Sequence, residues 1–390
     1  MKPAKSLRRR AASVAAWALP YWTRGKAGRE TPADLFRVLY LGWVVAFCFK
    51  VLGASWDVSW HFKWLRDDLA PPHLLNSVGT AIVVALTIVH VYTGYGVDRT
   101  AQRLIQWGTG LFLVAVPLDL INHRVNGLDI TSWSPSHMLL YIGTFFMICG
   151  VIRGWFIGAP PGRTRTLVLG GLFVFMFENV WFPAQHQEYG VFAIRSWDAG
   201  KPEAEPILLQ FAADQMGRGV DREMAVNFAL PVPDQVYPLY GVVAAMIVLV
   251  FARAMIGRRF AATAVVATYV AYRALIWPIL AVADFPRSAV PVFLIAGALA
   301  IDLAFLIRIP VVRALAGSLV ATLAVDLALR SQHFWASPPL ISPVTMAAGG
   351  AALAALWLGG EWFLGRYRLR AAEENEPQEM VAVVSATATP

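Results

Sequence analysis

The sequence predicts an all-α fold: a polytopic membrane helical bundle of about ten transmembrane helices, built partly from repeated two-helix units. Of its 390 residues, 57% are hydrophobic and only 15% are charged, whereas a soluble globular chain has roughly 45–50% and about 25%. Long apolar segments recur along the chain. Backbone polar groups inside lipid must be hydrogen-bonded within their own segment, so these segments are helices. The composition excludes a disordered chain, a disulfide scaffold and a soluble enzyme.

Ten segments approach the length of about 20 apolar residues that a helix needs to cross a hydrocarbon core of ~30 Å. In chain order they are Leu35–Ser55, Leu74–Gly96, Leu104–Ile121, His137–Gly158, Thr166–Phe182, Tyr237–Ile256, Phe260–Ala283, Val290–Ile307, Val311–Leu329 and Pro343–Gly365. The two cysteines, Cys48 and Cys149, lie inside these segments, and they form neither a disulfide framework nor a thiolate metal site.

Basic residues are concentrated before the first segment and in the loops that follow the even-numbered segments. By the positive-inside rule, we expect both termini in the cytoplasm, so that the odd-numbered helices end on the outer face. Membrane topology therefore accounts for the net charge of +8, and no nucleic-acid partner is expected.

One pattern of aspartate and histidine occurs twice in the first half of the chain. Each copy has an aspartate and a histidine four positions apart at the end of an odd-numbered segment, then a short polar turn, then a second histidine where the next segment begins. This is an internal repeat of a two-helix unit. The copies are 62 positions apart for Asp57 and Asp119, for His61 and His123, and for Asp67 and Asp129, and 64 apart for His73 and His137.

Residues four apart lie on one face of a helix, and Pro72 and Pro135 suit the start of the helix that bears the second histidine. Two neighbouring helices therefore bring one carboxylate and two imidazoles to the same depth near the outer interface. Such a set suits copper, zinc or non-haem iron. Polar residues at helix ends can also be merely interfacial, but ionisable groups at membrane depth are costly and usually functional. The predicted metal ligands are Asp57, His61, His73, Asp119, His123 and His137.

The first copy, D-x3-H-x4-R-D followed by P-x-H, resembles the metal-binding segment of the C subunit of the copper membrane monooxygenases, which include the particulate methane and ammonia monooxygenases. That family has D-x2-W-H-x4-R-D and then T-P-S-H; here the gap to the last histidine is one residue shorter. Its second set, Asn-x3-His-x13-His, has the spacing of the second copy, with Asp119 in place of asparagine. The resemblance covers residues 55–145 and implies copper as the bound metal. Residues expected to surround the ligands are Trp60, Arg66, Asp67 and Asp129.

The second half of the chain has a weaker parallel to the repeat. Asp326 is followed four positions later by Arg330, and Ser342-Pro343-Val344-Thr345 parallels Ser134-Pro135-Ser136-His137. This similarity has two explanations: a third two-helix unit that lacks the ligands, or a chance match. Glu178 and His186 could form or cover a site, or be an interfacial pair. His90 is expected to be a packed core residue, and Arg273 and Asp302 could bridge one another or mark a proton or substrate path.

Three functions remain open, and whether the chain is an enzyme is uncertain. The first is a copper monooxygenase, or a subunit of one, that oxidises a small apolar or nitrogenous substrate with dioxygen. Because the chain has no flavin or nicotinamide fingerprint, this function needs an external electron donor such as quinol, and additional membrane subunits are possible partners. The second is non-catalytic copper handling, and the third is a zinc-stabilised scaffold. The lipid bilayer is a partner in all three.

The expected location is a bacterial inner (plasma) membrane, with the metal sites toward the outer face. The chain divides into a basic cytoplasmic segment (1–34), a metal-binding transmembrane half (35–185), an outer-face loop (186–236), a second transmembrane half (237–365) and a disordered cytoplasmic tail (366–390).

Overall fold

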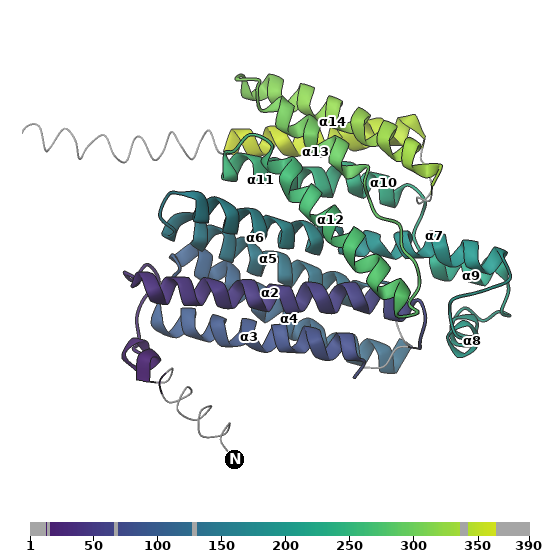
Figure 1. Cartoon of the computed structure of the whole chain (residues 1–390), viewed down its shortest axis with the longest axis horizontal. Helices are drawn as coiled ribbons and strands as arrows, with labels where there is room; N and C mark the ends of the chain where they lie inside the picture. The colour runs from purple at the N-terminus through teal and green to yellow at the C-terminus, as the bar shows by residue number, and fades with distance from the viewer. Residues whose placement is uncertain (1–12, 14–15, 66–68, 127–130, 336–341, 364–390) are drawn as a thin grey trace, which may run out of the picture. The chain divides into compact units, whose positions relative to one another are not determined.

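The computed structural model describes residues 13, 16–65, 69–126, 131–335 and 342–363, without the side chains of residues 123, 124 and 126. Throughout these residues the regular elements are helices (Figure 1), and the one β-type contact is an isolated bridge between Arg29 and Tyr95. Nine described helices are long and apolar enough to cross a membrane. The prediction of an all-α polytopic bundle is confirmed.

The predicted segments correspond to helices in chain order. The bounds are α2 Ala33–His61, α3 Pro71–Thr93, α4 Arg99–Asn126, α5 Pro135–Gly158, α6 Arg163–Trp181, α10 Val236–Tyr240 continued through Gly241–Ala245 into α11 Met246–Ile256, α12 Ala261–Val282, α13 Leu294–Ala304, α14 Pro310–His333, and a C-terminal helix Pro343–Phe363. The eighth segment differs most from its prediction, because α13 has 11 residues. The chain before it is irregular, since the Ala289 amide donates to the Glu188 carbonyl instead of to a helical neighbour.

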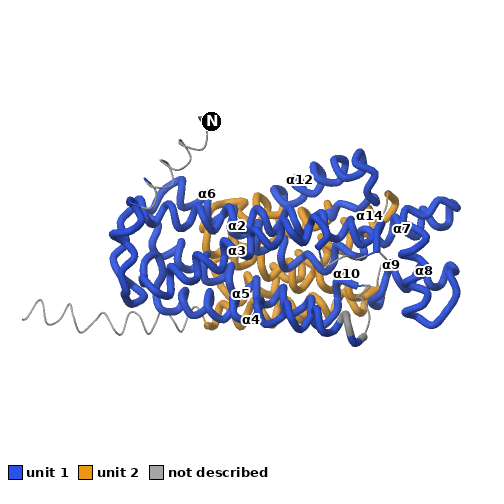
Figure 2. The backbone as a smooth tube through the Cα atoms, turned by 90° about the horizontal axis from the view of Figure 1, so that it is seen from below, with its two compact units in different colours: residues 1–233, 267–291, 336–338 blue, residues 234–266, 292–335, 339–390 orange. Residues whose placement is uncertain are grey.

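The chain forms two compact units, drawn in different colours in Figure 2. Unit 1 comprises residues 1–233, 267–291 and 336–338, and unit 2 comprises residues 234–266, 292–335 and 339–390. The boundary passes through α12, whose first turns belong to unit 2 and whose remainder belongs to unit 1. All of the predicted metal ligands fall in unit 1.

Close helix packing in unit 1 repeats with the same period as the ligands. A Cβ added at Gly79 of α3 would lie 2.7 Å from the Ala46 carbonyl of α2, and one added at Gly143 of α5 would lie 2.9 Å from the Gly108 carbonyl of α4. The two contacted carbonyls, of Ala46 and Gly108, are 62 positions apart, and the two glycines, Gly79 and Gly143, are 64 apart. Small residues allow such backbone approach in membrane helices. The two-helix repeat is therefore a repeat of packing as well as of sequence.

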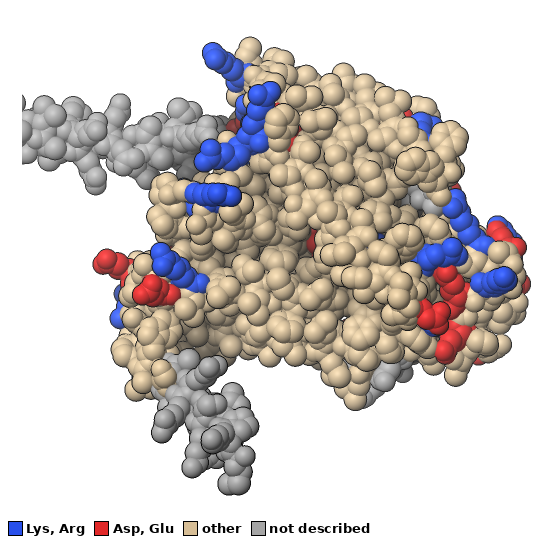
Figure 3. Space-filling model, in the orientation of Figure 1, with Lys and Arg blue, Asp and Glu red and all other residues tan. Residues whose placement is uncertain are grey.

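The segment expected to be an outer-face loop is largely helical. After the short turn Phe182–Ala184, it forms α7 Gln185–Asp198, α8 Pro206–Gln215 and α9 Arg222–Ala229. Val58 and Phe62 at the end of α2 pack with Leu208 and Phe228 of these helices. We call α7–α9 the helical cap. Figure 3 shows acidic and basic side chains over the cap.

Unit 2 satisfies its buried charges internally. The Asp302 carboxylate of α13 accepts hydrogen bonds from the Ala262 and Thr263 amides at 3.2 and 2.8 Å, which caps the start of α12. It also lies 3.2 Å from the Arg253 guanidinium. Asp302 was expected to bridge Arg273 or to mark a path; the structure gives it partners other than Arg273, and a role in a proton or substrate path stays a prediction.

Candidate metal centre

Asp57, His61 and His73 come together where α2 ends and α3 begins. One ligand atom from each lies within 4.8 Å of the other two. The Asp57 Oδ1 atom is 2.8 Å from His73 Nε2 and 3.7 Å from His61 Nε2, and the two imidazole centres are 5.6 Å apart. These contacts follow from the sequence, because Asp57 and His61 share one face of α2 and the short turn brings the first turn of α3 beside them.

The spacing of these three atoms is suitable for a metal ion. Bonds of about 2.0–2.2 Å to one ion hold the ligand atoms about 3–4 Å apart. The side chains are between 19% and 26% exposed, so the group is neither sealed in the protein nor fully solvated. Two imidazoles and one carboxylate leave coordination positions for a further ligand.

The second predicted set is described in part. The Asp119 Oδ1 atom of α4 lies 3.8 Å from His137 Nε2 of α5. The His137 Nδ1 atom is 3.1 Å from the Thr131 carbonyl. A proton on Nδ1 would be donated there, which leaves the Nε2 lone pair directed toward Asp119. The Ser134 hydroxyl accepts a hydrogen bond from the His137 amide at 3.3 Å and caps α5. The backbone of His123 lies in α4, but its side chain is outside the described residues.

The residues expected around the ligands are mostly outside the described part of the chain: Arg66, Asp67 and Asp129 are in that category. Trp60 is described, and its ring contacts are aromatic. Its centroid is 4.6 Å from that of Trp64, 6.0 Å from that of Trp56 and 6.2 Å from that of Phe285. No described contact ties Trp60 to a ligand, so its role as a supporting residue stays a prediction.

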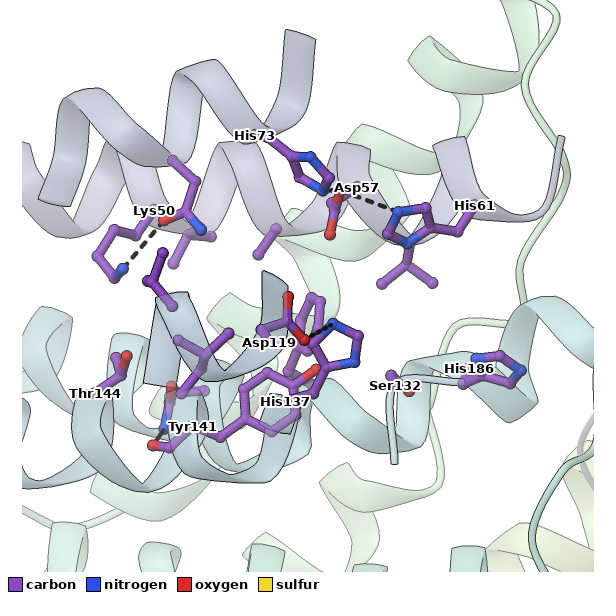
Figure 4. Close-up of a pocket in the computed structure, with 18 of the residues that line it drawn as sticks. Lys50, Asp57, His61, His73, Asp119, Ser132, His137, Tyr141, Thr144 and His186 are labelled. Carbon is purple, nitrogen blue, oxygen red and sulfur yellow. Dashed lines mark hydrogen bonds and ion pairs between the residues drawn. The ribbon is translucent and has the colours of Figure 1, made fainter. Parts of the chain in front are cut away.

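The described side chains of both ligand sets line one cavity of about 650 Å³ in unit 1. Figure 4 shows Asp57, His61 and His73 on one side of this cavity and Asp119 and His137 on the other. Leu113 and Val116 of α4 form part of its wall, and they are 44% and 39% exposed.

Lys50 also lines this cavity, although it was not among the residues predicted from the sequence. It lies seven residues before Asp57 on α2, two helical turns along the same face. Its ammonium is 3.1 Å from Asn76 Oδ1 and 3.9 Å from the centre of the Phe112 ring, and the residue is only 8% exposed. The sequence alone could have pointed to Lys50, because placing a lysine within an apolar membrane segment costs free energy and such residues usually have a function.

Glu178 lines the cavity from α6 and belongs to a buried polar network. It accepts a hydrogen bond from Gln185, which also donates to the Tyr269 hydroxyl. Arg273 donates to the same hydroxyl and lies 3.0 Å from Glu188. Arg273 thus has its carboxylate partner, Glu188, within unit 1, and not the bridge to Asp302 that was one of its expected roles.

The remaining described histidines differ in their surroundings. His90 is buried, and its ring nitrogens contact the Trp43 indole N–H at 2.9 Å and the Tyr95 carbonyl at 2.8 Å; it is a packed core residue, as predicted. His186 lines the cavity, and its Nε2 is 3.1 Å from the Phe228 carbonyl of the cap. His333 is exposed at the end of α14.

Comparison of the chain with protein-family models, with curated proteins and with solved structures found no match. The helices and the ligand cluster define an integral membrane protein with a group of candidate metal ligands beside a cavity.

Proposed function

We propose that the chain binds copper at Asp57, His61 and His73, and that it is a copper-dependent monooxygenase or a subunit of one. The observation that carries the proposal is the convergence of these three ligand atoms within 4.8 Å at the wall of a cavity. The distant resemblance of residues 55–145 to the C subunits of the copper membrane monooxygenases favours copper over zinc or iron.

In this proposal the chain's own residues hold the ion and shape the space beside it. His61 and His73 would supply neutral nitrogen ligands and Asp57 an anionic oxygen ligand. Bound copper would supply one-electron chemistry with dioxygen. The overall reaction consumes the substrate, one dioxygen, two electrons and two protons, and it yields the hydroxylated product and water. The electrons must come from an external donor, and a quinol in the membrane is one such donor.

The cavity supports a small apolar or nitrogenous substrate. Much of its wall away from the ligands is formed by apolar side chains, among them Val51, Ala54, Val116 and Leu140. Leu113 and Val116 of α4 line the cavity and are partly exposed, and in this proposal a substrate dissolved in lipid reaches the ligands past this helix.

Metal analysis of the purified protein, with electron paramagnetic resonance of the bound ion, tests the copper site. We expect His73→Ala to remove about one copper ion per chain. His333→Ala is the matched control, since it removes an exposed histidine from unit 2 and should leave the copper content unchanged. Full copper retention by both His73→Ala and Asp57→Ala would place the metal elsewhere.

Non-catalytic copper handling is the second candidate, and one observation favours it. Each side chain in the first ligand set is about one-fifth to one-quarter exposed, so an ion could pass to a partner protein without a large rearrangement. Turnover separates the two functions. Copper-loaded membranes with a quinol donor and any required subunits should hydroxylate a short alkane or ammonia; inactivity on every substrate, with intact copper transfer to an acceptor protein, would support handling.

A further inference from the structure

A second hollow lies between α3 and α4 in unit 1, separate from the histidine clusters. It has a volume of about 980 Å³ and is lined by Val84, Ile88 and Val91 of α3 and by Gly110 and Leu113 of α4. Ile88 is 52% exposed and Val91 is 38% exposed, so the hollow is an open groove on the outer surface of the helices. We call it the α3–α4 groove. It extends for about 12 Å of helix between Val84 and Tyr92.

One end of the groove is basic. Arg24, Gly25 and Lys26 line it there, and neither basic side chain forms an ion pair with any described residue of the chain. Beside them, the Trp22 and Tyr92 rings stack with centroids 4.9 Å apart. Stacked aromatic residues at the end of a membrane helix are typical of the headgroup level. The groove thus passes from an apolar region to a cationic one at the expected depth of a lipid headgroup.

The basic end is held rigidly against α3. The Gly25 amide donates to the Tyr92 carbonyl at 3.0 Å. A Cβ at Gly25 would lie 2.3 Å from the Thr93 carbonyl, and a Cβ at Gly94 would lie 2.1 Å from the Lys26 carbonyl. Gly94 also has a φ of +74°, which favours glycine. These contacts fix the backbone that bears Arg24 and Lys26 at this end of the groove.

The two threonines in the wall of the groove are already hydrogen-bonded within the protein. The Thr87 hydroxyl donates to the Val83 carbonyl at 2.8 Å and lies 3.0 Å from the Thr109 hydroxyl. They need no partner from a ligand, so an alkyl chain can cover them at little cost. At Gly110 the floor is open, since a Cβ there would meet no atom within 4 Å.

We propose that the α3–α4 groove is a binding site for an anionic phospholipid, with the lipid phosphate at Arg24 and Lys26 and part of an acyl chain along α3 and α4. Two neighbouring cations that have no ion-pair partner among the described residues favour a headgroup of net negative charge over a zwitterionic one. Basic pockets between membrane helices are known to hold anionic headgroups for this reason. Leu113 lines both this groove and the cavity of the metal centre, so the acyl chain would end beside the wall of that cavity.

Native mass spectrometry of the purified full chain tests the site, with phosphatidylglycerol and phosphatidylcholine of identical acyl chains as probes. We expect one tightly held lipid and a preference for phosphatidylglycerol on the order of 10- to 30-fold, given the contribution of each basic residue near the headgroup. The double change Arg24→Gln and Lys26→Gln should abolish the preference. Arg258→Gln with Arg259→Gln is the matched control, because it removes two exposed arginines outside the groove.

A second variant tests the acyl part independently of charge. Gly110→Leu should fill the floor of the groove and reduce retention of both lipids at least several-fold. Gly171→Leu on α6 is its control, because that glycine is exposed and also has open space at its Cβ position. Excess inorganic phosphate should not displace the lipid. An unchanged preference in the Arg24/Lys26 variant, an equal loss in the Arg258/Arg259 control, or lipid displacement by phosphate alone would overturn the proposal.

Discussion

Two regions of the molecule place an aspartate on the last turns of a long helix but give it different partners. In α2 of unit 1, Asp57 is followed four residues later by His61, and the pair meets His73 of the next helix. In α14 of unit 2, Asp326 is followed four residues later by Arg330, and their side chains form an ion pair of 2.9 Å. Two differences separate these regions: arginine replaces the histidine four residues after the aspartate, and threonine replaces the histidine of the next helix.

Helix α5 of unit 1 and the C-terminal helix Pro343–Phe363 of unit 2 begin with the same kind of cap. The Ser134 hydroxyl accepts from the His137 amide at 3.3 Å, and the Ser342 hydroxyl accepts from the Thr345 amide at 3.2 Å. Both serines precede a proline and cap a membrane helix in the same way. The helix of the second half therefore has the same serine cap as α5, whereas Thr345 stands where α5 has His137. Local backbone geometry and ligand chemistry are separable in this scaffold.

The largest expected effect comes from converting the first region into the second. His61→Arg should let the new guanidinium pair with Asp57, as Arg330 pairs with Asp326, and should weaken copper binding by at least about 100-fold. Copper titration followed by electron paramagnetic resonance measures this, and helicity in the same sample reports the fold. Unchanged copper affinity would break the comparison.

A smaller effect is expected from the helix packing that positions the ligands. Gly108→Ala would place a Cβ 2.4 Å from the Met147 amide nitrogen and 2.6 Å from the Gly143 carbonyl, so it should destabilise the protein by about 2–3 kcal/mol. Gly110→Ala, two residues along α4, meets no atom within 4 Å and should stabilise by about 0.5–1 kcal/mol through helix propensity. Unfolding of both variants in mixed detergent measures the difference; equal stabilities would argue against close packing of α4 and α5.

The smallest effect is expected in unit 2. Asp326→Asn removes the carboxylate from a pair in which Arg330 is 38% exposed, so the loss of stability should be below about 1 kcal/mol. Copper content should not change, in contrast to the effect of Asp57→Asn. Thermal unfolding and metal analysis of the two asparagine variants side by side test this. Loss of copper from the Asp326 variant would assign unit 2 a share in the site.

The sequence predicted the helices well because lipid leaves the backbone few alternatives. The prolines and charges of residues 186–236 indicated a loop, and they did not specify its short helices, in which apolar residues such as Leu208 and Phe228 pack with residues of α2. The spacing of Asp57, His61 and His73 predicted their convergence, because that depends on helix periodicity and one short turn. The partners of Arg273 and Asp302 depend on contacts between distant helices, which periodicity does not specify.

The close glycine contacts between α2 and α3 have a consequence for biogenesis. Every described member of the first ligand set belongs to two consecutive helices joined by a short turn, and Gly79 lets those helices pack directly on one another. Membrane helices first insert and then associate, so this hairpin can pair once its second helix has entered the bilayer. The ligand set would then form early in synthesis, before the ribosome has translated unit 2, and copper could be acquired by the nascent chain.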